Sequence, residues 1–552
     1  MIKPSNRIFL YFLFFIPVVV LIVMKNYAYY WDGISYAINL ENLPIEHTFH
    51  RHHLVYTPFC YAIYLVISKI GISMRSIDFL IILNIIFGLI YLTACFLIFK
   101  MIFHDFPIAA PLGTMFIAIS YTFGTYFRNT TPYLIPMAIC AVVFLRIISQ
   151  SRNEKNLRVT PVDWILLFIA VLFHQIALLM LPAVIFAQMM SVNQYRSRII
   201  IRNILIFSIS FFGIYLMIFY LTGLYTTQTS FLNWMSGYAF TDFWVFREAK
   251  GFLPAIQKST VESIISHKAL FVAPVERSLL RVFEFNRTFS DDFQDRWVGW
   301  ILFIVIIAFI LCGIGSMLRN HAHQRLAKFL LIWILMHIAF FNLFTPYQNF
   351  YRMFYLLPLA ILMLEGIKKT RWTRVNLTFG IILLLTFTYV NFLRGFVPES
   401  LPENNPYLVF SKKVEEKTDK HDLFIFTMFP DYHYGLYLQY FGNRDVFWLR
   451  DFQSYRYPGA NFEKLWTISQ QTRDFINDNY NKLYLPIETI IPKTGCLRLV
   501  HKKQLNYDFE LLLLMPMQIS TSSFNQLGSR YFYEVELIEY KPSLFSPLND
   551  LS

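Results

Sequence analysis

The chain has 552 residues, of which 56% are hydrophobic, 18% aromatic and only 15% charged. A soluble domain carries about a quarter charged residues, so this composition excludes an ordinary water-soluble protein. The net charge of +13 lies largely in short loops between apolar runs, where membrane topology explains it, and it does not indicate a nucleic-acid partner.

Long apolar runs recur from the N-terminus to residue 393 and then stop. About twenty apolar residues are needed to cross a bilayer as a helix. We therefore predict membrane helices over 8–24, 79–99, 106–127, 129–145, 203–222, 297–318, 329–345 and 375–393. The first is predicted to be a retained helix, because the residues after it do not form a signal-peptide cleavage site.

Two further apolar regions need interpretation. The uncharged stretch 164–195 is too long for one crossing, and His174 and Gln175 lie near its middle. Two short helices that meet at His174 would keep the flanking basic residues on one face of the membrane, as the positive-inside rule favours. The run 53–72 contains Pro58 and is interpreted as an amphipathic or re-entrant helix at the outer interface.

The loop charges then predict the topology. With the N-terminus in the cytoplasm, the cytoplasmic loops hold seventeen Lys and Arg residues and the short outer loops hold seven. We predict a polytopic α-helical membrane domain over 1–396 with about eleven transmembrane helices and outer loops 25–75 and 226–296. A small α/β extracytoplasmic domain is expected over 397–552, because β-rich runs there flank a helical pattern over 461–480.

The first outer loop places an acid near basic and aromatic side chains. Asp32 follows the first helix, and a cluster comes later in the loop: His50, Arg51, His52, His53 and Tyr56. A carboxylate can take a proton from an acceptor hydroxyl, and cations can stabilise a departing phosphate. Alternatively, Asp32 caps the helix that follows it, and the histidines pack among interfacial aromatic residues or bind a divalent metal.

Other polar residues are predicted on the same outer face. Arg352 ends a run that begins at Pro346, and an arginine so close to the bilayer is costly unless it has a partner. Its planar guanidinium suits a phosphate, and snorkelling at the interface is the alternative. His174 at the helix break and Arg128 are weaker candidates. Asn129 begins a glycosylation sequon, which matters only in a eukaryotic lumen.

In combination, these features resemble the GT-C superfamily of glycosyltransferases, which includes protein O-mannosyltransferases and the aminoarabinose transferases of lipid A. The resemblance covers residues 1 to about 395. It rests on Asp32 after the first helix, the His- and Pro-rich approach to a half-buried helix, the pair broken near His174 and the Pro346 to Arg352 run. It implies a polyprenyl-phosphate or diphosphate sugar donor, inversion of the anomeric centre, and work at the outer leaflet.

By this resemblance Asp32 is the catalytic carboxylate, although the family often has an acidic pair where this chain has Gly33. The residues predicted to contact the donor phosphate or substrate are His50, Arg51, His52, His53, Tyr56, Arg128, His174, Tyr347 and Arg352. The resemblance implies no cofactor and leaves a divalent metal open. The implied partners are the lipid-linked donor, a lipid, glycan or protein acceptor, and the lipids of a bacterial inner membrane.

Other functions fit the same sequence. A transporter or flippase for lipid-linked sugars also needs polar residues in an apolar bundle, although the later spans do not repeat the first-loop pattern. A polysaccharide ligase or polymerase shares the donor and usually concentrates its function in one large outer loop, so the loop 226–296 keeps that alternative open. A scaffold whose tail binds another protein or a glycan is a third.

Overall fold

The computed structural model divides into two compact units, one formed by Met1–Ala273 with Phe289–Leu401 and the other by Pro274–Thr288 with Pro402–Ser552. The structure describes residues 15–42, 45, 48–151, 157–190, 196–223, 230–236, 259–261, 263–266, 293–321, 323–344, 348–369, 373–426, 432–448, 483–486, 491–493, 496–498, 517–527 and 530–537.

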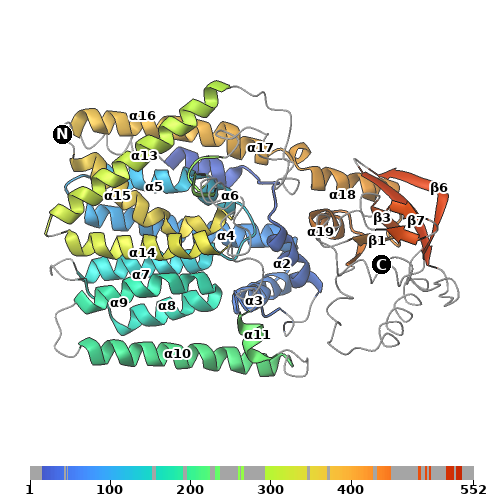
Figure 1. Cartoon of the computed structure of the whole chain (residues 1–552), viewed down its shortest axis with the longest axis horizontal. Helices are drawn as coiled ribbons and strands as arrows, with labels where there is room; N and C mark the ends of the chain where they lie inside the picture. The colour runs from blue at the N-terminus through green and yellow to red at the C-terminus, as the bar shows by residue number, and fades with distance from the viewer. Residues whose placement is uncertain are drawn as a thin grey trace, which may run out of the picture. The chain divides into compact units, whose positions relative to one another are not determined.

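The first unit is helical, and its long helices run side by side (Figure 1). A helix over 15–23 comes first. The helices that follow are α2 (Trp31–Asn42), α3 (Tyr56–Lys69), α4 (Ser76–Ile102), α5 (Ala109–Ile119), α6 (Tyr121–Phe127), α7 (Leu134–Gln150), α8 (Pro161–Phe173), η2 (Gln175–Met180), α9 (Leu181–Met190), α10 (Arg196–Leu221), α11 (Phe231–Ser236), α13 (Phe293–Arg319), α14 (Gln324–Leu343), η9 (Phe350–Tyr355), α15 (Leu356–Lys369), α16 (Thr373–Asn391), η10 (Phe392–Phe396) and α17 (Val397–Glu399).

Several of these helices suit a bilayer. Six helical stretches of the described chain are long and apolar enough to cross a membrane: Ser76–Ile102, Ser197–Leu221, Gly299–Arg319, Gln324–Leu343, Phe350–Lys368 and Gly380–Glu399. Four shorter apolar helices accompany them. Large apolar side chains such as Ile209 and Ile304 are exposed on their outer faces, a pattern that marks a surface facing lipid. The chain is a multi-pass α-helical membrane protein.

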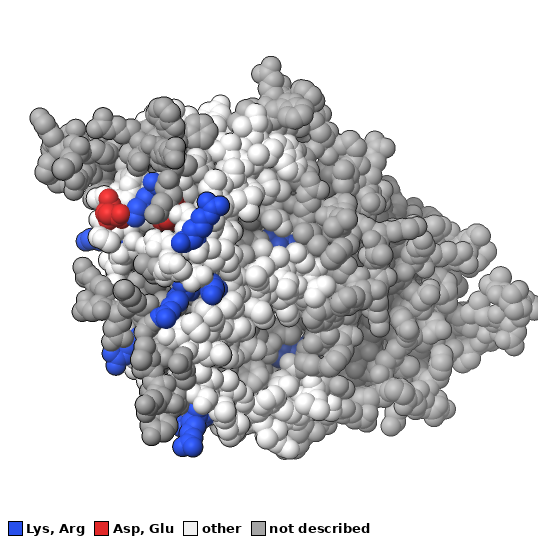
Figure 2. Space-filling view, turned by 60° about the vertical axis from the view of Figure 1, so that its left-hand side comes forward, with Lys and Arg blue, Asp and Glu red and all other residues white. Residues whose placement is uncertain are grey.

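Basic side chains lie at the helix ends remote from α2 and α3, over the face turned forward in Figure 2. The exposed ones include Lys100, Arg158, Arg202, Arg319, Arg325 and Lys328. These residues lie at or next to helix ends that are predicted from the loop charges to face the cytoplasm.

The predicted break at His174 is confirmed. α8 begins with a capping box, in which Thr160 and Asp163 satisfy each other's backbone N–H groups, and it ends at Phe173. His174 then adopts an extended backbone, with φ −161° and ψ 127°, and its side chain accepts a hydrogen bond from the N–H of Ile176. The chain therefore restarts as a separate helical segment.

The prediction of one helix over 106–127 is wrong, because α5 ends at Ile119 and α6 begins at Tyr121. The N–H of Tyr121 donates to the carbonyl of Ile264 in the long outer loop, at 3.0 Å, instead of continuing the helix. The described part of that loop near Ile264 is buried in the first unit. Asn391 of α16 holds it, donating to the Ile264 carbonyl at 2.9 Å and accepting from the N–H of Ser266 at 2.9 Å.

Glycines allow the closest helix contact in the bundle core, where α13 meets α15. A Cβ at Gly313 would lie 1.8 Å from the carbonyl oxygen of Leu362, and a Cβ at Gly366 would lie 2.0 Å from that of Phe309. Only glycine lets the two backbones approach this far.

The second unit combines helices with sheets. Its elements are η11 (Pro402–Asn404), α18 (Pro406–Lys417), β1 (Leu423–Phe426), α19 (Tyr432–Phe441), β2 (Asp445–Trp448), β3 (Leu483–Pro486), β4 (Ile491–Lys493), β5 (Cys496–Arg498), β6 (Met517–Leu527) and β7 (Arg530–Leu537). Five strands form a sheet in the order β2-β1-β3-β7-β6, and β1 is parallel to both its neighbours. The predicted helix over 461–480 and the β-rich run that begins at Phe509 lie outside the described residues.

Candidate active site

Asp32 lies in the first turn of α2, at the end of the bundle where α2 and α3 are found (Figure 1). α2 begins at Trp31, so Asp32 does not occupy the capping position before the helix. The residue is half-buried. Burial raises the pKa of its carboxyl to about 7, and the nearby Tyr30 hydroxyl lowers it in part. A carboxyl with a pKa near neutrality suits a general base.

A hydrogen bond connects the helix of Asp32 to the histidines of the same loop. Tyr36 lies one turn after Asp32 on α2, and its hydroxyl is hydrogen-bonded to Nε2 of the buried His53. The N–H of His53 donates to the carbonyl of His50 at 3.1 Å, and the two imidazole rings lie 4.0 Å apart between centroids. Nδ1 of His53 is buried and has no hydrogen-bond partner among the described residues.

The helix break brings His174 to the same place. Its ring stacks on that of His53, with centroids 5.8 Å apart and an angle of 18° between the planes. On its other side lies Tyr133, whose ring centroid is 5.0 Å away. The structure therefore brings together three of the predicted histidines, from segments more than a hundred residues apart.

Burial shifts the pKa values of His50, His52 and His53 so that the neutral form of each imidazole is favoured at physiological pH. Burial, together with the nearby guanidinium of Arg51, lowers the pKa of His50 to about 3 and that of His52 to about 4. Burial also lowers the pKa of His53 well below its usual value. The half-buried Arg51 supplies the positive charge of this cluster.

Gln175 fixes the backbone of this cluster, and the sequence analysis did not include it among the site residues. Its Nε2 donates to the carbonyl of Arg51 at 2.9 Å, and its N–H donates to that of His52 at 2.9 Å. Its Oε1 lies 3.1 Å from Nδ1 of His52. Tyr215 of α10 donates to the Arg51 carbonyl as well, at 2.8 Å. The only sign of Gln175 in the sequence was its position beside His174 at the predicted helix break.

Aromatic rings line the approach to Asp32. Tyr30 contacts Phe350 at 5.2 Å between centroids, and Phe350 stacks on Tyr133 at 4.9 Å. Tyr351 lies edge-on to Tyr133 at 5.6 Å. These rings come from three separate parts of the chain and form an aromatic wall beside Tyr30.

Arg352 is fully buried behind this wall. Its Nε donates to Oγ of Ser259 at 2.9 Å, and its terminal nitrogens lie 3.3 and 3.4 Å from Oδ1 of Asn342. Arg352 therefore connects the long outer loop to α14.

Tyr56 is also fully buried, and its ring packs edge-on against that of Tyr36 at 5.3 Å between centroids. Tyr347 lies outside the described residues.

Arg128 is buried in an ion pair with Glu399, which the sequence analysis did not single out. The guanidinium lies 3.4 Å from Oε2 of Glu399, and its Nε donates to the carbonyl of Gly124 at 3.0 Å. Glu399 also accepts from the hydroxyls of Tyr121 at 2.7 Å and Thr125 at 3.1 Å. The pair is 271 residues apart in sequence, so local patterns give no sign of it.

The described residues contain no group of three or more His, Cys, Asp or Glu side chains arranged to hold a metal ion. The imidazoles of His53 and His52 are hydrogen-bonded to Tyr36 and Gln175, respectively.

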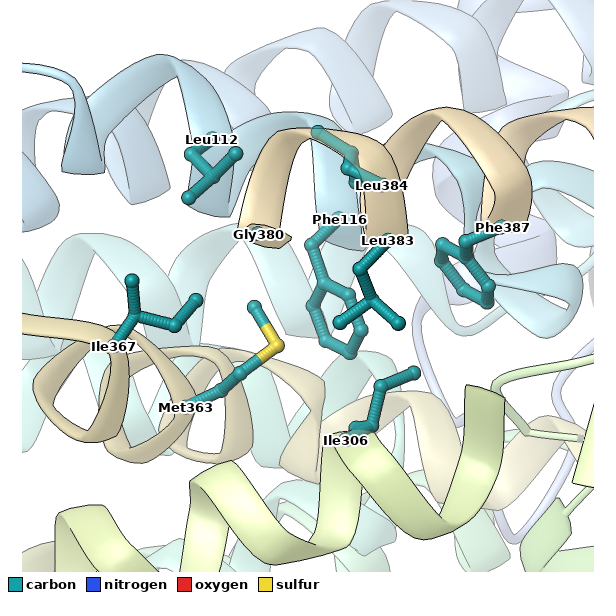
Figure 3. Close-up of a pocket in the computed structure, with 9 residues that line it drawn as sticks. All are labelled: Leu112, Phe116, Ile306, Met363, Ile367, Gly380, Leu383, Leu384 and Phe387. Carbon is teal, nitrogen blue, oxygen red and sulfur yellow. The ribbon is translucent and has the colours of Figure 1, made fainter. Parts of the chain in front are cut away.

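The pocket shown in Figure 3 lies elsewhere, between α5, α13, α15 and α16. Its nine lining residues are all apolar, so it cannot supply acid–base chemistry.

No protein-family profile matches the sequence, and no curated protein matches it. Several solved structures, however, are similar to this chain in fold. ArnT from Cupriavidus metallidurans bound to undecaprenyl phosphate superposes with a TM-score of 0.55 at 9% identity, over 96% of this chain and 98% of that one. The apo form of the same protein gives a TM-score of 0.52 at 10% identity, with the same coverage. The oligosaccharyltransferase of Archaeoglobus fulgidus gives 0.48 at 13% identity, over 88% and 70%.

The chain shares the overall fold of these ArnT structures. The resemblance stated from the sequence implies an acidic pair at the start of α2, whereas this chain has Gly33 after Asp32. A Cβ at this position would lie 1.6 Å from Oγ1 of Thr130 and 2.2 Å from its carbonyl oxygen. α2 therefore packs directly on the segment after Arg128, and this site has one carboxylate at the start of α2.

Proposed function

We propose that this protein is an inverting glycosyltransferase, which moves a sugar from a polyprenyl-phosphate or diphosphate donor to an acceptor at the outer face of the membrane. One observation supports this above all others. In a GT-C-like fold, a half-buried carboxyl with a pKa of about 7 lies on the helix that Tyr36 joins to the histidine cluster.

The proposed reaction is a single displacement. Asp32 accepts the proton of the acceptor hydroxyl, and the acceptor oxygen forms a new bond to the anomeric carbon of the sugar. The bond between that carbon and the phosphate oxygen breaks, and its electron pair leaves with the lipid phosphate. The carboxylate and the phosphate thus lie on opposite sides of the reacting carbon, which inverts its configuration.

We assign the donor phosphate to the side of the histidine cluster. Arg51 supplies charge, while His50, His53 and His174 supply hydrogen-bonding nitrogens around it. His52 is oriented by Gln175 and supports its neighbours. Tyr56 packs beside the cluster against Tyr36, and Arg352 holds the long outer loop against α14. Arg128 pairs with Glu399 and donates to the carbonyl of Met24, just before the segment that leads to Asp32. No step of the proposed reaction uses a metal ion.

We further propose that the chain crosses a bacterial inner membrane about eleven times, with its N-terminus in the cytoplasm. Six long apolar helices, four short ones and the helix over 15–23 support that number. The basic helix ends in Figure 2 support the orientation, since cytoplasmic loops are enriched in Lys and Arg. The second unit would then be a small α/β domain outside the membrane.

The rate of transfer should depend on pH through Asp32. Because burial raises the pKa of this carboxyl to about 7, it is protonated and inactive as a base below that pH. We expect kcat/KM to fall about tenfold for each pH unit below 7 and to level off above it. Initial rates in detergent across this range would show it. A rate that increases as the pH falls would contradict the assignment of Asp32 as the base.

Replacing Arg51 by alanine should weaken donor binding. A hydrogen bond to a charged group contributes about 1.5–3 kcal/mol, so we expect the KM for the lipid-linked donor to increase roughly 10- to 100-fold. Lys69→Ala is the matched control, because Lys69 is an exposed cation at the end of α3 in the same outer loop. If both variants bind the donor as the wild type does, Arg51 is not a phosphate ligand.

The function itself is tested by comparing lipid extracts from wild-type and deletion cells by mass spectrometry. A transferase predicts that deletion cells accumulate the glycosylated carrier lipid and lack the sugar on its acceptor. Purified protein in vesicles that contain this donor and the unglycosylated acceptor from deletion cells should then release free polyprenyl phosphate or diphosphate. Movement of intact donor across the vesicle membrane without cleavage would instead support the transporter alternative.

A further inference from the structure

The segment that leads into α2 has no regular structure, although it places the proposed base. Residues 25–30 run from the first helix to Trp31 outside any helix or strand. Such a segment positions a side chain accurately only if other groups fix its backbone. The contacts of this segment therefore decide where the Asp32 carboxylate lies.

Hydrogen bonds hold this segment at several points. The N–H of Tyr27 donates to the carbonyl of Glu399 at 2.8 Å. The N–H of Ala28 donates to Oδ1 of Asn26 at 2.8 Å. Asn26 itself donates to the Thr125 carbonyl at 3.2 Å. These contacts fix the beginning of the segment against α6 and α17.

Asn129 fixes the end nearest the base. Its Nδ2 donates to the carbonyl of Ala28 at 2.6 Å, and its Oδ1 accepts from the N–H of Tyr30 at 3.0 Å. The same oxygen accepts from the N–H of Thr130 at 2.8 Å. The amide thus binds the chain on both sides of Tyr29, three residues before Asp32.

Asn129 is itself held rigidly. It is buried, and its carbonyl accepts a hydrogen bond from the side chain of Asn84 on α4. Arg128 before it is paired with Glu399, and Thr130 after it packs against Gly33. All three residues of the sequon, Asn129 to Thr131, are buried. This asparagine therefore cannot serve as a glycosylation acceptor in the folded protein.

We infer that Asn129 is a positioning residue for the reaction, which orients the Asp32 carboxylate by fixing the backbone between Ala28 and Tyr30. This inference rests on the proposed function of Asp32 as the base. Asn129 touches no reacting atom, and its effect passes entirely through the segment before α2. Its three side-chain hydrogen bonds are the structural evidence for this role.

The test uses the full-length protein and compares Asn129→Ala with Asn391→Ala. Asn391 is an equally buried asparagine whose side chain also makes three hydrogen bonds, but to Ile119, Ile264 and Ser266. We expect Asn129→Ala to lower kcat roughly 100-fold, the cost of a misplacement of about 1 Å, with little change in the KM for the donor. Asn391→Ala should retain the wild-type kcat.

A double-mutant cycle separates positioning from general stability. If Asn129 acts only through Asp32, then adding Asn129→Ala to Asp32→Asn should cause no further loss of the residual activity. An equal loss of kcat in both backgrounds would overturn the inference, as would an unchanged kcat in Asn129→Ala. Should that variant not fold, Asn129→Asp keeps the bonds accepted from Tyr30 and Thr130, places an acceptor oxygen against the Ala28 carbonyl in place of the donor, and should also lower kcat.

The outcomes also distinguish this inference from the function on which it rests. Full activity of Asp32→Asn would refute the proposed base and the positioning role together. An inactive Asp32→Asn combined with equal kcat values for Asn129→Ala and Asn391→Ala would leave the proposed function intact and refute only the role of Asn129.

Discussion

Replacing Asp32 by asparagine should lower the rate of sugar transfer by roughly two to four orders of magnitude, the contribution expected of a general base. The variant keeps the size of the side chain and removes its ability to accept a proton. The binding of the lipid-linked donor should change little, because the donor phosphate is assigned to the histidine cluster. Single-turnover assays with a labelled donor would measure the chemical step separately from binding.

Asp105→Asn is the control for this experiment. Asp105 follows the far end of α4 and forms an ion pair with Lys368 at 2.6 Å. Its replacement should leave the transfer rate unchanged. Thermal unfolding adds a second check. Because the pKa of the Asp32 carboxyl is raised from 3.8 to about 7 on folding, this group reduces the free energy of unfolding progressively as the pH rises through that range, and the full cost is present above pH 7. Asp32→Asn should therefore be at least as stable as the wild type above pH 7. A normal rate of sugar transfer by Asp32→Asn would refute the proposed mechanism in which Asp32 is the general base.

Replacing Glu399 by alanine should give the largest loss of stability. The change leaves the guanidinium of Arg128 buried without its carboxylate, which costs roughly 3–5 kcal/mol. It also removes the acceptor for Tyr121 and Thr125. We expect a marked decrease in the unfolding temperature of the purified protein in detergent.

Two comparisons make the Glu399 result specific. Asp105→Asn breaks the pair with Lys368, in which Asp105 is half exposed, and should cost no more than about 1 kcal/mol. Replacing both buried partners, as Arg128→Met with Glu399→Leu, should recover much of the lost stability because no charge is left buried. If Glu399→Ala unfolds at the same temperature as Asp105→Asn, the buried pair is not a major support of the fold.

The sequence predicted those parts of the fold that local chemistry determines. Apolar run lengths located the long helices, and the polar interruption at His174 located the broken pair. Helix ends were less predictable: α5 stops at Ile119 because the chain turns to meet Ile264, a partner 145 positions away. Composition alone does not reveal such contacts.

The candidate site, like the fold, was predictable only where its residues are close together in the sequence. The first outer loop could be recognised because its acid and its histidines are neighbours in sequence. Gln175 and Asn129 were missed as supporting residues because their partners come from distant segments. Glu399 was missed for the same reason, since its charge is balanced by Arg128 only after folding.

Because Gly33 lies directly against Thr130, the residue that position 33 can hold depends on the placement of residue 130. A second carboxylate beside Asp32 cannot be introduced by changing residue 33 alone, because its Cβ would overlap Oγ1 of Thr130. A smaller residue at 130 would not relieve the overlap, because the new Cβ would still lie 2.2 Å from the backbone carbonyl oxygen of residue 130. An enzyme that carries an acidic pair here must have the helix displaced from that wall, so no single substitution converts the single-acid site into a double-acid site without loss of packing.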